Sequence, residues 1–143
     1  MSGGLIIGLN NIFIQTNLTS LEAITSIGCV PAIYNTELTT LSGLDGLTSF
    51  GNGSLDIREN PVLTTLSGIT SIYWSLRIGG NDSLTTLSGL GNLNSVNNIH
   101  IGILKSFAVQ CPNLSIFCAL TDLFESNIYT LVYIANNAYN PTV

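Results

Sequence analysis

The chain has 143 residues, of which 8% are charged, whereas about a quarter are charged in typical soluble domains. Three basic and eight acidic residues give a formal net charge of −5, and three basic side chains are too few to neutralise a nucleic-acid backbone. We therefore expect no nucleic-acid partner. Hydrophobic residues make up 45%, which argues against a disordered chain. No apolar run reaches the roughly 18 residues of a membrane-spanning helix, so we expect no transmembrane segment.

The start of the chain and its cysteines bear on the cellular compartment. Residues 1–5 carry neither the basic nor the apolar segment of a secretory signal peptide, so we expect either a protein that stays in the cell or a mature or trimmed form. The cysteines, Cys29, Cys111 and Cys118, are odd in number and irregularly spaced, unlike a disulfide framework. Cys111 and Cys118 are close enough in sequence to pair, and two buried free thiols fit at least as well.

One phrase recurs along the chain, and it predicts a repeat architecture. L-T-T-L-S-G-L begins at Leu38 and Leu84, and L-T-T-L-S-G-I begins at Leu63. Weaker copies begin at Leu18 and Leu114, so that successive copies are 20, 25, 21 and 30 residues apart. No single repeat can bury its apolar row alone, whereas stacked repeats bury it against one another, which indicates a solenoid.

A second phrase, L-x-I-x-x-N, precedes the copies and predicts the strands. It occupies residues 12–17, 30–35, 55–60 and 76–81. Weaker members occupy residues 99–104 and 131–136. The L-x-I part places two apolar side chains on one face of a strand, and the closing Asn suits a sharp turn. We expect the turn asparagines to stack as a structural ladder: Asn17, Asn35, Asn60, Asn81 and Asn136.

These patterns predict a mainly β protein in which about six parallel strands stack as a β-solenoid. The L-x-x-L-x-x-L segments could also be helix stripes, but they are dense in Thr, Ser and Gly, which are poor helix formers. We expect one domain over residues 1–143, with regular repeats at 5–101 and a divergent repeat with a short helical or irregular cap at 102–143. Helix is expected at residues 104–110 and 115–125.

Glycine recurs at one place of the repeat. Gly43, Gly68 and Gly89 are equivalent in the three strong copies. A glycine at a fixed place predicts a turn with positive φ or a close approach of two backbones.

The repeats resemble a known family. The resemblance lies in LTTLSGLDGLTS (38–49), LDIREN (55–60), LTTLSGITSI (63–72), LRIGGN (76–81) and LTTLSGLGNLNSV (84–96). These segments are similar to the receptor L-domain type of leucine-rich repeat, which occurs in extracellular parts of receptor kinases and in bacterial and fungal surface proteins. The resemblance implies a right-handed parallel solenoid that recognises proteins or sugars without catalysis, outside the cell or at its surface.

Stacking predicts that equivalent outward residues form columns across the sheet. One column is Phe13, Pro31, Asp56, Arg77, His100 and Val132. The next is Gln15, Ile33, Arg58, Gly79, Gly102 and Ile134. In one interpretation, Asp56 and Arg77 form a cross-strand ion pair that fixes the register, with Arg58 diagonal to it. In the other, this is a ligand face with polar anchors and apolar contacts: Asp56, Arg58, Arg77, His100, Phe13, Tyr73 and Trp74.

The sequence lacks a catalytic or metal-binding constellation. His100 is the only histidine, and neither a partnered nucleophile nor a second carboxylate is within its expected reach. One His and scattered Cys supply too few metal ligands. We expect no enzyme activity, no cofactor and no metal.

Hydroxyl side chains form two further columns. These are Thr19, Thr39, Thr64 and Thr85, and beside them Thr40, Thr65 and Thr86. The plainer interpretation is a solvent-exposed repeat position, and the sharper one is an ice- or crystal-binding surface with regular spacing and little charge.

Three hypotheses for the function follow. The first is a non-enzymatic extracellular or cell-surface protein that acts in binding or adhesion through a protein or glycan ligand. The second is a structural subunit that assembles with itself into a filament, sheath or surface layer, since open solenoid ends expose unpaired strand edges. Ice binding is the third.

Overall fold

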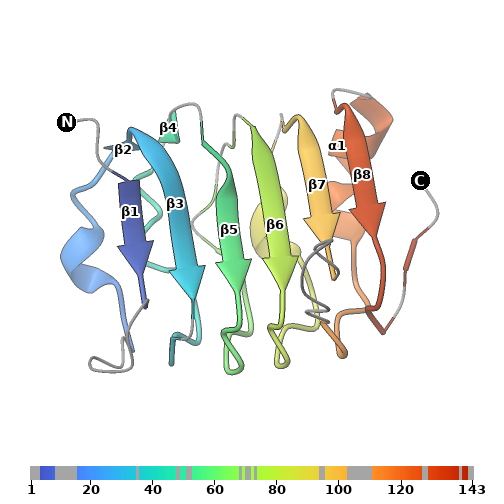
Figure 1. Ribbon diagram of the computed structural model, residues 1–143, viewed down its shortest axis with the longest axis horizontal. Coiled ribbons are helices and arrows are strands. Elements are labelled where there is room, and N and C mark those ends of the chain that lie inside the picture. The colour runs from blue at the N-terminus through green and yellow to red at the C-terminus, as the bar shows by residue number, and fades with distance from the viewer. Residues whose placement is uncertain are drawn as a thin grey trace.

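The computed structural model describes residues 4–8, 16–34, 36–47, 49–50, 53–67, 69, 72, 74–93, 96–102, 111–126, 129–138 and 140–141. The protein is mainly β, and its parallel strands are stacked as a β-solenoid with little helix (Figure 1). The strands are β1 (Gly4–Ile7), β2 (Ser26–Ile27), β3 (Cys29–Tyr34), β4 (Ser49–Phe50), β5 (Leu55–Arg58), β6 (Ser75–Gly79), β7 (Asn98–Ile101) and β8 (Leu131–Ile134). The helices are the 3₁₀ turns η1 (Thr19–Leu21), η2 (Ser88–Leu90) and η3 (Cys118–Leu120), and the short α-helix α1 (Thr121–Ser126).

One six-stranded sheet runs the length of the molecule in the order β1-β3-β5-β6-β7-β8. Every neighbouring pair is parallel, and the order follows the chain, so that β1 and β8 are the outermost strands (Figure 1). The inward row of the register joins Ile7, Ile33, Ile57, Ile78, Ile101 and Ile134. β2 and β4 form a second, two-stranded parallel sheet.

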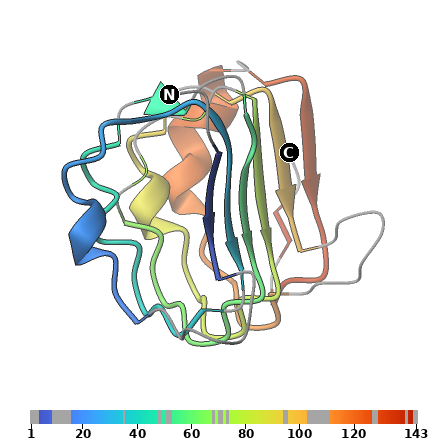
Figure 2. The ribbon, with the colours of Figure 1, turned by 60° about the vertical axis from the view of Figure 1, so that its left-hand side comes forward.

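Opposite the sheet, the chain returns through segments in which every third residue is apolar (Figure 2). Their backbone amides bond to the carbonyl three residues earlier, as in Leu44 N to Leu41 O (3.1 Å) and Leu90 N to Leu87 O (2.9 Å). This is 3₁₀ geometry, in which side chains three residues apart lie in line. The three-residue spacing of leucine therefore directs one continuous row into the core.

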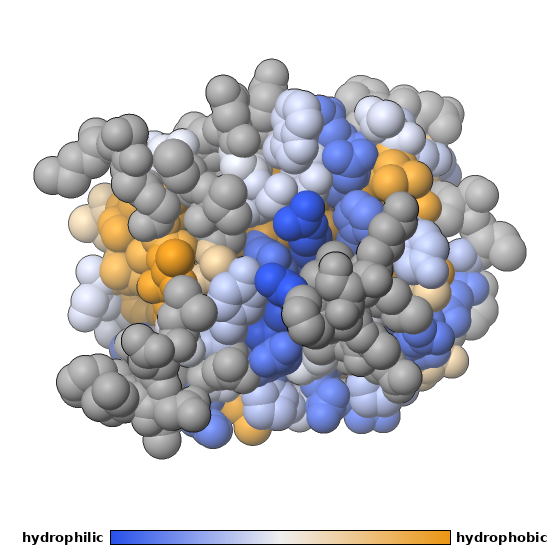
Figure 3. Space-filling model, in the orientation of Figure 1, coloured by the Kyte–Doolittle hydropathy of each residue, from blue (hydrophilic) through white to orange (hydrophobic). Residues whose placement is uncertain are grey.

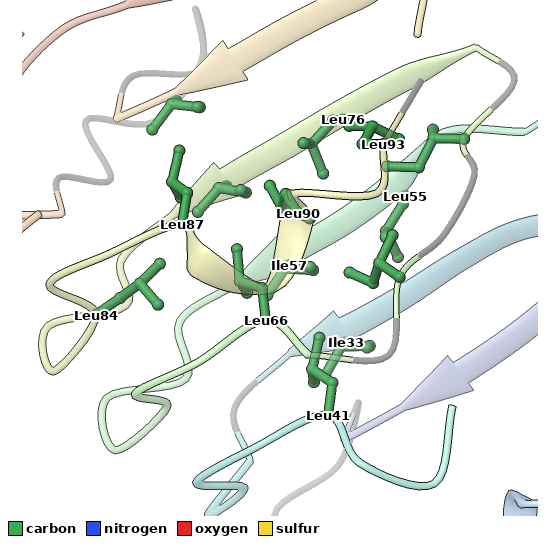
Figure 4. Packing of buried hydrophobic residues seen from close by; sticks show 14 of the residues in the cluster. Ile33, Leu41, Leu55, Ile57, Leu66, Leu76, Leu84, Leu87, Leu90 and Leu93 are labelled. Carbon is green, nitrogen blue, oxygen red and sulfur yellow. The ribbon is translucent and has the colours of Figure 1, made fainter. Parts of the chain in front are cut away.

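The core lies between the sheet and the returning segments. Figure 4 shows leucines of the returning segments, such as Leu66 and Leu90, beside Ile57 and Leu76 from the strands. All four side chains are fully buried. Each such residue contributes about 1.5–3 kcal/mol relative to an exposed one, which makes the stacked apolar rows the main source of stability.

The region after the strong repeats contains less helix than expected. Of the predicted helix at 115–125, residues 118–120 form η3 and the α-helix starts at Thr121. Glycine is needed at two positions of the repeat. Gly43 has φ +102°, and a Cβ there would lie 2.4 Å from Leu18 O. A Cβ on Gly89 would lie 2.1 Å from the Leu66 carbonyl carbon, so both positions are close approaches of two backbones. Gly68 and the helix predicted at 104–110 lie outside the described residues.

A buried asparagine closes each central strand. Asn60 is fully buried; its Nδ2 donates to Ile33 O and Arg58 O (both 3.1 Å), and its Oδ1 accepts from Thr36 N (3.2 Å) and Thr36 Oγ1 (2.7 Å). Asn81 repeats this by donating to Ile57 O at 3.1 Å. The predicted ladder is therefore present at these two positions.

One ladder position was assigned to the wrong residue. Asn137, not Asn136, has the equivalent bonds, with Nδ2 donating to Ala135 O at 3.1 Å, whereas Asn136 is exposed at φ +56°. Asn17 is exposed and accepts from Thr19 Oγ1 at 2.9 Å, which is a local turn contact. Asn35 lies outside the described residues. Two hydrogen bonds place Thr36 beside Asn60, and a bridge places Cys111 level with Asn137.

Candidate binding face

The outer face of the six-stranded sheet, the side turned away from the core, carries the candidate site. Its central column is Ile6, Ala32, Asp56, Arg77, His100 and Tyr133. Asp56, Arg77 and His100 are neighbours across three strands, as expected. On β3 and β8 the expected register was wrong by one residue, because Ala32 replaces Pro31 and Tyr133 replaces Val132 in this column.

The same shift changes the second column. Ile33 and Ile134 belong to the inward row, and Ile33 is 2% exposed. The residue level with Arg58 on β3 is Tyr34. Gly79 is level with Arg58 on β6, as expected.

Tyr34, Asp56 and Arg58 form one compact cluster, which we call the tyrosine clamp. Arg58 Nη2 donates to Tyr34 Oη (2.9 Å), and Tyr34 Oη donates to Asp56 Oδ2 (3.2 Å). The Arg58 guanidinium also forms an ion pair with Asp56 and lies 4.9 Å from the centre of the Tyr34 ring. Burial opposes the charge on Arg58, but the Tyr34 hydrogen bond and Asp56 outweigh it and raise the pKa of Arg58. The clamp thus holds a charged pair rigidly on the sheet.

The expected ion pair between Asp56 and Arg77 is not the one that forms. The two residues are level on β5 and β6, but Asp56 pairs with Arg58, two residues along its own strand. Arg77 is half-buried, and no described residue forms an ion pair with it. Its guanidinium is therefore a charged donor group that the described fold does not use.

Around this centre the outer face is aromatic and apolar. Tyr133 on β8 is 44% exposed, Ile6 on β1 is 54% exposed, and His100 is half-buried between the centre and β8. Trp74, just before β6, is 50% exposed. Figure 3 shows apolar surface over β1 and β3 and hydrophilic surface over the middle of the sheet. Phe13, Gln15 and Tyr73 lie outside the described residues.

The threonine columns lie at the returning segments, and several of their hydroxyls bond within the fold. Thr64 Oγ1 donates to Thr39 O (3.0 Å), Thr40 Oγ1 lies 2.7 Å from the Ser42 hydroxyl, and Thr86 Oγ1 accepts from Ser88 N (3.2 Å). Thr19, Thr39, Thr64 and Thr85 are exposed, whereas Thr40, Thr65 and Thr86 are half-buried. The hydroxyls of Thr40, Thr64 and Thr86 thus bond within the fold.

Cys111 and Cys118 are free thiols, the first buried and the second exposed. Burial raises the pKa of the Cys111 thiol, against the lowering effect of its hydrogen bonds with Asn81. Cys111 lies at a ladder position between Asn81 and Asn137, which the asparagine pattern did not predict. The sequence does indicate this position, because C-P-N-L at 111–114 matches N-P-V-L at 60–63, where Asn60 begins the segment.

Within the described ranges, no three His, Cys, Asp or Glu side chains lie together as a metal site would require. None of the helices described is long and apolar enough to cross a membrane. The chain matches no family model, no curated protein and no solved structure.

Proposed function

We propose that this chain is a non-enzymatic binding module of the extracellular space or cell surface, and that it binds a protein or glycan ligand on its outer face. The proposal rests mainly on Arg77, whose charge is not paired within the described fold. Its level neighbour Asp56 is paired with Arg58, and Arg77 has no ion-pair partner among the described residues. A guanidinium presents five N–H donors in a planar fork, which suits a ligand carboxylate or several sugar hydroxyls.

The surroundings of Arg77 support recognition. Tyr34 is held in place by Arg58, and Tyr133 presents a partly exposed ring on β8. Tyrosine and arginine are the residue types enriched where binding energy concentrates, because they combine large contact area with hydrogen bonding. A rigid parallel sheet keeps these groups at fixed spacing, so little ordering cost is added on binding.

We also propose that the repeats belong to the receptor L-domain type that they resemble. On that basis the solenoid has six right-handed coils, one for each strand of the sheet, and the region of η3 and α1 serves as a C-terminal cap. Stacked repeats of this kind offer extended surfaces for partners without a catalytic cleft.

The test is binding of the labelled chain to an array of acidic and neutral oligosaccharides and to a panel of purified extracellular protein domains. Arg77→Ala should weaken binding at least about tenfold, equivalent to about 1.4 kcal/mol, and Arg77→Lys should retain part of it. Asp122→Ala, which alters an exposed charge on α1, is the matched control and should leave binding unchanged. No binding by the unaltered chain on either panel, or equal binding by Arg77→Ala, would contradict the proposal.

A further inference from the structure

The two ends of the solenoid differ from its middle in one respect. Among the described residues, seven hydrophobic side chains pack on the core but remain partly exposed. They are Leu5, Leu21, Ile24, Ala119, Phe124, Val132 and Ile134. The first three belong to β1 and the returning segment after it, and the other four belong to η3, α1 and β8. The incompletely covered core is thus confined to the first and last layers of the stack.

Within the described residues, the outermost strands themselves carry neither charged side chains nor proline. β1 and β8 each pair with one neighbour in the sheet, so each leaves one row of backbone groups unpaired within it. Natural edge strands are usually guarded by charged residues or proline. Residues 4–8 and 129–138 contain neither. Ile6 on β1 and Leu131 on β8 instead place large apolar side chains at the edges, 54% and 48% exposed.

From these observations we infer that the β8 edge of one copy pairs in parallel with the β1 edge of a second copy, so that the solenoid continues head to tail. The second copy is the partner that fits, because it continues a register already present in the sheet. Ile7 of the next copy extends the inward row that ends at Ile134, and Ile6 then lies beside Tyr133. The same step brings the partly exposed Leu21 and Ile24 toward Phe124.

This contact joins two different surfaces, so it does not close on itself and produces a filament. Six strands at about 4.8 Å give an axial repeat of roughly 29 Å per copy. Glu22 and Asp122, exposed near opposite ends, repel each other across the contact. The experiment is therefore done at 0.15 M salt, where the screening length is about 8 Å.

The test is sedimentation velocity of the untagged chain over a hundredfold range of concentration, with negative-stain images at the top concentration. The unaltered chain should grow without stopping at a dimer, and should form rods. Ile6→Glu blocks the β1 edge and Leu131→Glu blocks the β8 edge, and each variant alone should stay monomeric. Mixed together they should form a one-to-one heterodimer and stop there, because one intact β8 edge meets one intact β1 edge.

Trp74→Glu is the matched control, since it places the same charge on a similarly exposed residue, 50% exposed, in the middle of the stack just before β6. It should assemble like the unaltered chain, and circular dichroism should show that all three variants are folded. A monomeric unaltered chain at every concentration would overturn the inference. So would homodimers of either edge variant, which mean pairing of like edges, or assembly that the edge variants leave unchanged.

Discussion

Asn60 and Asn81 lie one above the other where β5 and β6 end, and Asn81 Oδ1 accepts hydrogen bonds from both Asn60 N (3.1 Å) and Asn60 Nδ2 (3.2 Å). Both residues are fully buried. A single amide oxygen thus satisfies two donors of the neighbouring layer, in a place that water does not reach. The contact joins successive layers of the stack by the same kind of bond that joins successive strands.

Asn60→Ala should be among the most destabilising changes in the chain. It leaves Ile33 O, Arg58 O and the Thr36 hydroxyl without their partner. A buried unsatisfied polar group costs about 1–3 kcal/mol, so we expect a loss of about 3–5 kcal/mol, measured by denaturant unfolding. Asn113→Ala, which removes one exposed hydrogen bond to Asp82 O, is the control and should cost under about 1 kcal/mol. Equal losses for the two variants would show that the ladder is not structural.

The stacked architecture could be predicted from the sequence because two spacings of its apolar residues each match one kind of backbone geometry. A three-residue period matches the 3₁₀ returning segments, and the alternation in L-x-I matches a strand with one buried face. These rows, for example Leu84, Leu87, Leu90 and Leu93, are buried as predicted.

The errors on β3 and β8 have one cause. The phrases at 30–35 and 131–136 were aligned through Asn35 and Asn136, whereas Thr36 and Asn137 hold the ladder places. A slip of one residue exchanges the two faces of a strand. The slip placed Ile33 instead of Tyr34 level with Arg58, so the tyrosine clamp was not predicted. The pairing of Asp56 with Arg58 depends on side-chain geometry around Tyr34, which no spacing rule contains.

Two neighbouring glycines should respond oppositely to alanine. A Cβ on Gly89 would lie 2.1 Å from the Leu66 carbonyl carbon, whereas a Cβ on Gly91 would have no atom within 4 Å. Gly89→Ala should destabilise by about 1–3 kcal/mol or more, because backbone must move. Gly91→Ala should be neutral or stabilise by up to about 1 kcal/mol, since it restricts the unfolded chain. Thermal unfolding of both variants measures this, and a destabilised Gly91→Ala would contradict the packing described.

The tyrosine clamp should behave as a coupled unit. Arg58→Met leaves the buried Asp56 carboxylate without its ion pair. Loss of one partner of a fully buried pair costs about 3–5 kcal/mol, and we expect a smaller loss here because the Arg58 side chain is 22% exposed. The double variant Asp56→Leu/Arg58→Met removes both charges and should be more stable than Arg58→Met alone. A double-mutant cycle of unfolding free energies measures the coupling. Simple additivity of the single effects would mean that the pair contributes nothing.

The two free thiols should react at different rates. Cys118 is exposed, whereas Cys111 is buried and its thiol has a raised pKa, so little thiolate is present to react. With iodoacetamide at pH 8, peptide mapping should find label on Cys118 first and on Cys111 only in denaturant. A Cys111–Cys118 disulfide, or equal labelling of both in the native chain, would refute the assignment.

Cys111 should also make stability depend on alkaline pH. The unfolded thiol has an ordinary pKa of 9.0, and the folded value is higher because burial disfavours the thiolate. The neutral thiol therefore contributes its full stability below the ordinary value, and this contribution is lost as pH rises through the raised folded value, because unfolding then releases a proton. Unfolding free energies from pH 7 to about pH 10.5 should fall more steeply for the unaltered chain than for Cys111→Ala. All other titrating groups are common to both chains and cancel in the difference, so parallel curves would mean that Cys111 is not buried as described.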